Sequence, residues 1–75
     1  MIRITVKLFA TLRKDRFDVA EGEFPEGATV SDVLLRYSVP EKDVTLIFIN
    51  GRHGNCDTVL FDGDTLSLFP PVGGG

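Results

Sequence analysis

The last residues of the sequence are those whose types and spacing suggest chemistry. The sequence closes with Phe69-Pro70-Pro71-Val72-Gly73-Gly74-Gly75. A proline has no N–H and a fixed φ, so two prolines cannot extend a sheet and hold the chain extended. Glycines have no side chain to bury and are costly to order, so they add nothing to a core. We therefore expect a thin backbone that enters a narrow channel, with the Gly75 carboxylate carrying the chemistry.

This tail has the reach that such a role requires. At roughly 3.3–3.6 Å per extended residue, residues 70–75 span about 20 Å. That length connects the surface of a small domain with a buried site in a partner. Stiff prolines limit the entropy lost when the tail enters such a site. We therefore predict a folded domain over residues 1–69 and an extended tail over residues 70–75.

Composition and charge exclude several classes of function. The 75 residues, 43% hydrophobic and 25% charged, are typical of one small soluble domain. The net charge of −3 argues against nucleic-acid binding, which requires a basic face. No apolar run is long enough to span a membrane, and the first residues lack the apolar core of a signal peptide. We therefore expect a cytoplasmic protein that binds neither nucleic acid nor membrane.

Other residues that could do chemistry stand alone. Cys56 is the single cysteine and has no evident activating neighbour, so a structural role is favoured. With one histidine, His53, the sequence offers no zinc-binding set, and it contains no P-loop for ATP. Asp62 and Asp64 flank a glycine, as acidic residues in tight turns do. We predict that the chain binds no metal and no cofactor and is not catalytic alone.

Hydrophobic periodicity predicts the elements that position the tail. Residues 2–8 alternate between apolar and polar side chains, which is typical of a strand with one buried face. A second strand from Phe17 pairs with it as a hairpin. We expect its continuation over residues 20–24 to be bulged or irregular, because it contains Gly22 and precedes Pro25.

A helix is predicted over about residues 30–38, within the usual error of 2–4 residues. Thr29 and Asp32 have the spacing of a capping box at its start, and Pro40 follows its end. Its apolar face is formed by residues at i, i+3, i+4 and i+7. These residues are Val30, Val33, Leu34 and Tyr37.

The second half of the chain predicts three more strands. The nearly continuous apolar run over residues 44–49 indicates a central strand covered on both sides, by the helix on one side and by a partner or a returning loop on the other. Asn50-Gly51 is a strong turn signal, and residues 58–61 form a short strand or edge segment. The last strand covers residues 65–69. The order strand, strand, helix, strand, short strand, strand predicts an α+β fold, with one main helix packed on one face of a mixed sheet.

This order and the protruding Gly-Gly end resemble the ubiquitin-like β-grasp, and within it the MoaD/ThiS sulfur carrier family. The resemblance covers nearly the whole chain. The ending is closest to that of the small subunit of molybdopterin synthase, whereas ThiS-like carriers usually lack the two prolines. This ending departs from the pattern of the molybdopterin synthase small subunit at Gly73, because a small residue such as alanine is common at that position. The residues that carry the resemblance are Leu8-Phe9-Ala10-Thr11-Leu12-Arg13, Thr29-Val30-Ser31-Asp32-Val33-Leu34, Ile49-Asn50-Gly51, Asp62-Gly63-Asp64 and the tail.

The resemblance implies a function. An E1-like adenylyltransferase (MoeB/ThiF-like) would use ATP to adenylate the Gly75 carboxylate, which is then converted to a thiocarboxylate. The thiocarboxylate would donate sulfur in the biosynthesis of molybdopterin, for a molybdenum or tungsten cofactor. The large subunit of molybdopterin synthase would bind this chain and supply the catalytic groups. The alternatives are a carrier for thiamine thiazole synthesis, a ubiquitin-like protein modifier and a passive interaction module.

Two groups of site residues follow. The tail that threads into partner sites comprises Pro70, Pro71, Val72, Gly73 and Gly74, ending at Gly75. By alternation, Phe69 lies on the polar face of its strand, either as an anchor for a partner or folded back onto the edge of the core. The same contact surface would be extended by Ile47, Ile49, Leu60 and Phe61, although an ordinary core position is favoured for each of them taken alone.

Overall fold

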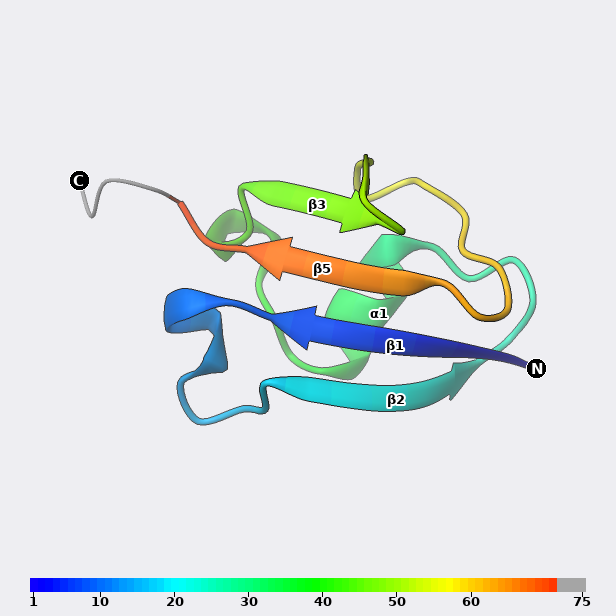
Figure 1. The fold of residues 1–75 in the computed structure, drawn as a ribbon, viewed down its shortest axis with the longest axis horizontal. Helices are drawn as coiled ribbons and strands as arrows, with labels where there is room; N and C mark the ends of the chain where they lie inside the picture. The colour runs from blue at the N-terminus through cyan, green and yellow to red at the C-terminus, as the bar shows by residue number, and fades with distance from the viewer. Residues whose placement is uncertain (72–75) are drawn as a thin grey trace.

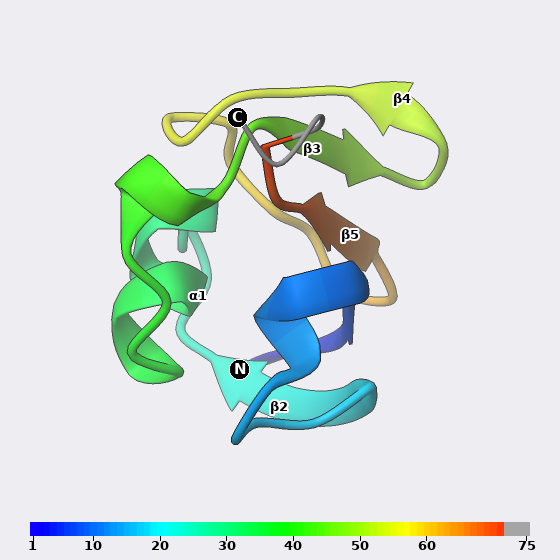
Figure 2. The same cartoon turned by 90° about the vertical axis from the view of Figure 1, so that its left-hand side faces the viewer.

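The computed structural model of the chain describes residues 1–71, in which one helix packs on one face of a five-stranded sheet (Figures 1 and 2). The prediction of an α+β fold with a mixed sheet is confirmed. Two short 3₁₀ helices, η1 (Ala10–Arg13) and η2 (Glu41–Asp43), lie in the connections. The principal elements are β1 (Ile2–Leu8), β2 (Val19–Phe24), α1 (Val30–Arg36), β3 (Leu46–Ile49), β4 (Arg52–His53) and β5 (Thr65–Phe69).

The first and last strands lie side by side in the middle of the sheet, whose order is β2-β1-β5-β3-β4. β1 pairs with β5 in parallel and with β2 in antiparallel orientation, while β3 pairs with β5 in antiparallel orientation. The chain therefore leaves the sheet from its centre, beside the end of β1 (Figure 1).

The core lies between the sheet and α1. Because side chains alternate across a strand, β1 places Ile2, Ile4, Val6 and Leu8 under the helix. The other face of the sheet carries no helix within residues 1–71 (Figure 2), and we call it the open face. The buried residues are Ile2, Ile4, Val6, Leu8, Leu12, Phe24, Ala28, Val30, Val33, Leu34, Val39, Ile47, Leu60, Leu66 and Leu68.

Helix α1 begins as the sequence predicts. The Asp32 carboxylate accepts a hydrogen bond of 2.8 Å from the backbone N–H of Thr29, which forms the capping box. The helix ends at Arg36, two residues before the predicted limit. Ser38 has a φ of 56°, which reverses the chain and ends the helical backbone before Pro40.

The predicted irregularity of residues 20–24 is wrong. β2 pairs with β1 in one unbroken register from Lys7↔Val19 to Ile2↔Phe24. A glycine is needed at position 22 because of a neighbouring side chain and not because of a bulge. A Cβ at this position would lie 2.5 Å from the hydroxyl oxygen of Tyr37. The Tyr37 ring packs edge-on against Phe17 and Phe24, so it has little room to move.

Replacing Gly22 by alanine is therefore expected to destabilise the fold, by about 1–3 kcal/mol, because the added methyl group collides with a packed ring. The Tyr37→Phe change removes the colliding hydroxyl and should restore most of this loss in the double variant. Urea unfolding of the two single variants and the double variant measures both effects. Equal stability of Gly22→Ala and the unchanged chain would contradict this explanation of the glycine.

The strand predicted over residues 44–49 is shorter in the structure, and of its two faces only the helix side is buried within residues 1–71. β3 comprises four residues, and its outer neighbour is the two-residue β4. Ile47 faces the core and is 7% exposed, whereas Leu46 and Phe48 lie half-buried on the open face. Residues 58–61 form only an isolated bridge, between Val59 and Thr29.

The two predicted turns are confirmed. Asn50 and Gly51 both have positive φ, which a two-residue hairpin loop requires, and they join β3 to β4. The Asp62 carboxylate accepts a hydrogen bond of 2.8 Å from the backbone N–H of Arg3, and Asp64 accepts one from Phe61. The Asp64 carboxylate therefore stabilises the turn itself, and the Asp62 carboxylate joins the turn to β1.

Candidate functional site

The site of interest is the point at which the chain leaves the sheet. The carbonyl of Leu68 accepts a hydrogen bond of 3.2 Å from the N–H of Phe9, and the carbonyl of Phe69 accepts one of 2.8 Å from Thr45. β5 is thus held from both sides up to its last residue. Pro70 and Pro71 have no N–H to continue the ladder, so the sheet fixes the starting point of the tail.

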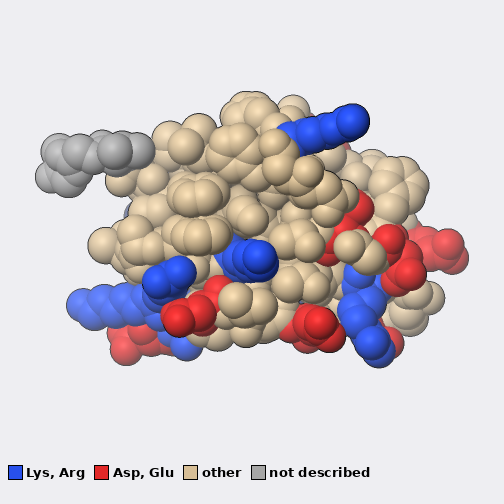
Figure 3. Space-filling model, in the orientation of Figure 1, with Lys and Arg blue, Asp and Glu red and all other residues tan. Residues whose placement is uncertain are grey.

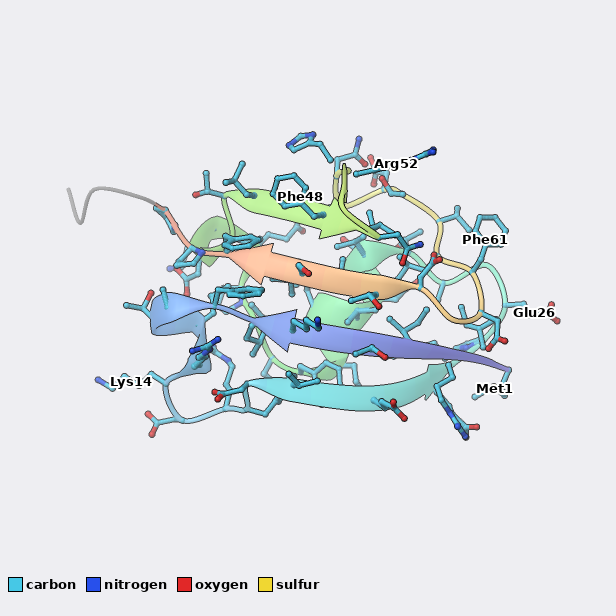
Figure 4. All side chains as sticks on the ribbon, in the orientation of Figure 1. Met1, Lys14, Glu26, Phe48, Arg52 and Phe61 are labelled. Atoms are coloured by element: carbon cyan, nitrogen blue, oxygen red, sulfur yellow. The ribbon has the colours of Figure 1, made fainter. Side chains whose placement is uncertain are left out.

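Three aromatic rings gather on the open face at this point, and we call Phe9, Phe48 and Phe69 the aromatic cluster. The rings of Phe9 and Phe69 stack with centroids 4.3 Å apart and planes within 8°. Phe48 meets Phe69 edge-on at 5.8 Å. All three are half-buried, so part of each ring remains accessible to a partner. In Figure 4, the side chain of Phe48 lies over β3 on the near side of the sheet.

Polar groups border the aromatic cluster on two sides. The Arg13 guanidinium lies 5.4 Å from the centroid of the Phe9 ring, and its Nε donates to the carbonyl of Leu8 at 2.8 Å. On the other side, the exposed His53 ring meets Phe48 edge-on at 5.9 Å. Figure 3 shows a broad uncharged surface above the basic side chains at the lower left. Apolar rings with a polar border are typical of a protein-docking surface.

The structure excludes one of the two alternatives for Phe69. Its pairing with Leu46 places it on the open face, so it does not fold back onto the edge of the core. Its ring rests on Phe9 and Phe48, which hold it in place while leaving it partly exposed. A ring fixed in this way loses little entropy when a partner binds.

The expectation that Ile47, Ile49 and Leu60 share the surface of Phe69 is wrong. Ile47 pairs with Leu68, and Ile49 pairs with Leu66. Since side chains of paired residues lie on the same face, both isoleucines face the helix side of the sheet. Leu60 is 1% exposed in the core.

Phe61 is 68% exposed, but it lies at the other end of β5 from Phe69 (Figure 4). At about 3.3 Å per residue, the strand between Thr65 and Phe69 alone separates the two ends by roughly 13 Å. Phe61 therefore does not extend the aromatic cluster. Phe61 instead lines a separate groove together with Ile49, Arg52 and Val59.

Part of the predicted tail can be placed. Pro70 is half-buried and Pro71 is exposed. The remaining predicted positions, Val72, Gly73, Gly74 and Gly75, lie outside the described residues.

Sequence reasoning missed Phe9 and Phe48 as site residues. Phe9 continues the alternation of Arg3, Thr5 and Lys7 on the outer face of β1, which was a usable signal. Its contact with Phe69 depends on the parallel pairing of β1 with β5, which joins the two ends of the chain.

Cys56 is poorly suited to carry sulfur. Burial raises the pKa of its thiol from 9.0 to about 11, and a hydrogen bond and the negative charges of Glu41 and Asp57 add to this. The reactive thiolate is therefore scarce at neutral pH. The prediction that Cys56 has no activating neighbour agrees with these surroundings.

The pH dependence of the rate at which the Cys56 thiol is alkylated measures this pKa. We expect the rate with iodoacetamide to rise with a midpoint near pH 11 in the folded chain and near 9 in urea. Since the pKa is higher in the folded state, the stabilisation from the neutral thiol is complete below pH 9 and is lost as the pH rises toward 11. A native midpoint at or below that in urea would contradict this assignment.

Two further observations concern residues 1–71. No three potential metal-ligating side chains come together in this part of the chain. None of its helices has the length and apolar character needed to cross a membrane.

Comparison with known proteins places this geometry in a family context. The model of the ThiS family matches residues 6–75. A protein of Pyrococcus furiosus assigned as molybdopterin converting factor subunit 1 is 35% identical, with a TM-score of 0.76 over 96% of this chain and 100% of that one. The small archaeal modifier protein 1 of Methanosarcina acetivorans is 30% identical, with a TM-score of 0.71 over 100% and 98% of the two chains.

A more distant structure supports the fold alone. A chain from the complex of subunits 1 and 2 of the Helicobacter pylori molybdopterin-converting factor is 24% identical, with a TM-score of 0.68 over 99% of this chain and 100% of that one. The search of curated proteins gave no match. The structural similarities confirm the prediction of a ubiquitin-like β-grasp fold.

Proposed function

Because the chain belongs to the ThiS family, within the MoaD/ThiS group of ubiquitin-like sulfur carriers, we propose that it carries sulfur for molybdopterin synthesis as a thiocarboxylate at Gly75. The observation that carries the proposal is the full-length similarity to the Pyrococcus furiosus protein, at 35% identity. The family consists of small non-catalytic carrier subunits, so the chain is a substrate of other enzymes and supplies no catalytic group.

The proposed chemistry starts from a poor electrophile. The negative charge of a carboxylate is delocalised, and its oxygen is a bad leaving group. An E1-like adenylyltransferase activates it when a carboxylate oxygen attacks the α-phosphorus of ATP and pyrophosphate leaves. A sulfur nucleophile at the oxidation level of sulfide then adds to the acyl carbon of the adenylate, and AMP leaves. The product is the thiocarboxylate of Gly75.

The fold contributes position to this chemistry. The hydrogen bonds that hold Leu68 and Phe69 fix the origin of the tail at the centre of the sheet. We propose that the aromatic cluster docks on the partner beside its active-site channel, so that residues 70–75 enter the channel in one orientation. Holding the reacting carboxylate in place lowers the entropic part of the activation barrier and so raises the rate of the reaction.

We propose two partners that use the same surface in turn. The adenylyltransferase loads the tail with sulfur, and the large subunit of molybdopterin synthase receives it for transfer to a pterin precursor. Because both must contact the base of the tail, they should compete for the chain. A competition experiment with the two purified partners measures this directly.

The experiment that tests the pathway is reconstitution with defined partners. The thiocarboxylated chain is mixed with the large subunit of molybdopterin synthase and its pterin precursor, and the dithiolene product is measured. The matched reaction contains a thiazole synthase and its substrates. Product from the first mixture supports the proposal, and product from the second alone would assign the chain to thiamine thiazole synthesis.

A protein modifier is the second candidate function. The 30% identity with the small archaeal modifier protein 1 of Methanosarcina acetivorans favours it. In that case the activated Gly75 would form an isopeptide bond with a lysine amine, with AMP as the leaving group. Tryptic peptides of other cell proteins in which a lysine carries residues 53–75 of this chain as a branch, found by mass spectrometry, would support this second role.

A further inference from the structure

The outer edge of the sheet at β2 is a surface that the proposed function does not use. β2 is the outermost strand, and within residues 1–71 no strand lies beyond it (Figure 1). An edge strand presents unpaired N–H and C=O groups, which are able to pair with another chain. The question is which groups are available and what would bind them.

The pairing with β1 identifies the outward groups. In an antiparallel pair, alternate residues exchange both hydrogen bonds with the partner strand. The N–H of Leu8 donates to the carbonyl of Asp18 at 2.9 Å, so the even-numbered residues of β2 continue this pattern toward β1. The backbone groups that point outward therefore belong to Val19, Glu21 and Glu23.

One of these groups is already covered. The Arg36 guanidinium donates to the carbonyl of Glu23 at 3.2 Å and so closes one end of the edge. Within residues 1–71, no hydrogen bond is recorded for the outward groups of Val19 and Glu21. The strand is six residues long, in regular register, and carries neither a proline nor a bulge, which often protect edges.

The side chains at this edge favour a basic partner. Val19 is 56% exposed, and Glu21 and Glu23 project from the open face (both acidic and basic side chains lie along the lower edge in Figure 3). Glu23 has a single weak ion pair, 3.8 Å from Arg3. A second copy of this chain, paired antiparallel about Glu21, would set like charges opposite one another, which is destabilising.

We propose that β2 binds an extended segment of a partner protein as an added strand, with Lys or Arg at alternate positions against Glu21 and Glu23. Backbone hydrogen bonds to Val19 and Glu21 supply affinity, and the alternating charges supply specificity. In the order of strands, β1 lies between β2 and β5, from whose end the tail starts, and an added strand would lie one position further out. A partner at β2 therefore leaves the aromatic cluster free, and the chain binds both partners at once.

The test uses a short synthetic peptide in which Lys and Val alternate, capped at both ends. In an NMR titration, we expect slowed hydrogen exchange at the N–H groups of Val19 and Glu21. A peptide of the same composition with all Lys before all Val should bind about 10-fold more weakly, since two cross-strand ion pairs of up to about 1 kcal/mol are lost. Equal binding of both peptides, or no protection at these amides, would overturn the proposal.

Two variants separate strand addition from simple charge attraction. Glu21→Pro removes an outward N–H without removing a hydrogen bond to β1, and edge strands accept such a proline. It should abolish protection of Val19. The double change Glu21→Lys and Glu23→Lys should transfer binding from the Lys–Val peptide to a Glu–Val peptide. If the double variant still prefers the Lys–Val peptide, the assignment of this edge is wrong.

Discussion

Removal of Gly75 is expected to lower the rate of thiocarboxylate formation at least about 100-fold, because misplacing a reacting group by even 1 Å costs this much. Without Gly75, the terminal carboxylate stops about 3.3–3.6 Å short of its position in the unchanged chain. The rate is measured by intact mass during incubation with the adenylyltransferase, ATP and a sulfur donor. Unfolding in urea should be unchanged, since the described core contains no residue beyond Leu68.

The control for this prediction separates length from sequence. Deleting Val72 shortens the tail by the same amount but keeps three terminal glycines. We expect it to be as inactive as the chain without Gly75, whereas Val72→Ala, which keeps the length, should retain most of the activity. If the chain without Gly75 forms the thiocarboxylate at the normal rate, the reaction does not depend on the position of the carboxylate, and the prediction is wrong.

Replacement of Phe69 by alanine is expected to weaken binding to both partners by at least about 2 kcal/mol, or about 30-fold in Kd, as at an aromatic hot spot. The ring stacks on Phe9 at 4.3 Å, so some stability is also lost, about 1 kcal/mol for one aromatic pair. Calorimetric titration with the large subunit measures the Kd, and urea unfolding measures the stability separately.

Phe61 supplies the matched control. It is the same residue type and is 68% exposed, but it lies at the opposite end of β5. Phe61→Ala should leave the Kd for both partners within about twofold, as surface contacts outside a hot spot do. A larger loss of affinity for Phe61→Ala than for Phe69→Ala would show that the partners bind at the Phe61 end of β5, which would contradict the proposed docking surface.

Local sequence signals predicted most of the fold. Alternation over residues 2–8 predicted β1 with its limits, and the spacing of Thr29 and Asp32 predicted the start of α1. These signals succeed because each depends on neighbours a few residues apart. The prediction of an irregular strand at Gly22 is wrong because the glycine makes room for Tyr37, which is fifteen positions later in the sequence.

The site depended on distant pairings that no local pattern contains. Phe69 was predicted on the open face by alternation, but its neighbours Phe9 and Phe48 come from β1 and β3. The run over residues 44–49 was read as covered on both faces because Leu46 and Phe48 are apolar. In the structure, Phe48 belongs to the aromatic cluster and Leu46 pairs with Phe69, both on the open face, so the same apolar pattern has a different cause.

The central claim is that the Gly75 carboxylate becomes a thiocarboxylate. The direct measurement is the intact mass of the chain after incubation with an E1-like adenylyltransferase, ATP and sulfide, followed by fragmentation of the tail. The account predicts a gain equal to the exchange of one oxygen for one sulfur, located at Gly75 and dependent on ATP. An unchanged mass with a partner that adenylates the chain, or sulfur found on Cys56 instead, would contradict it.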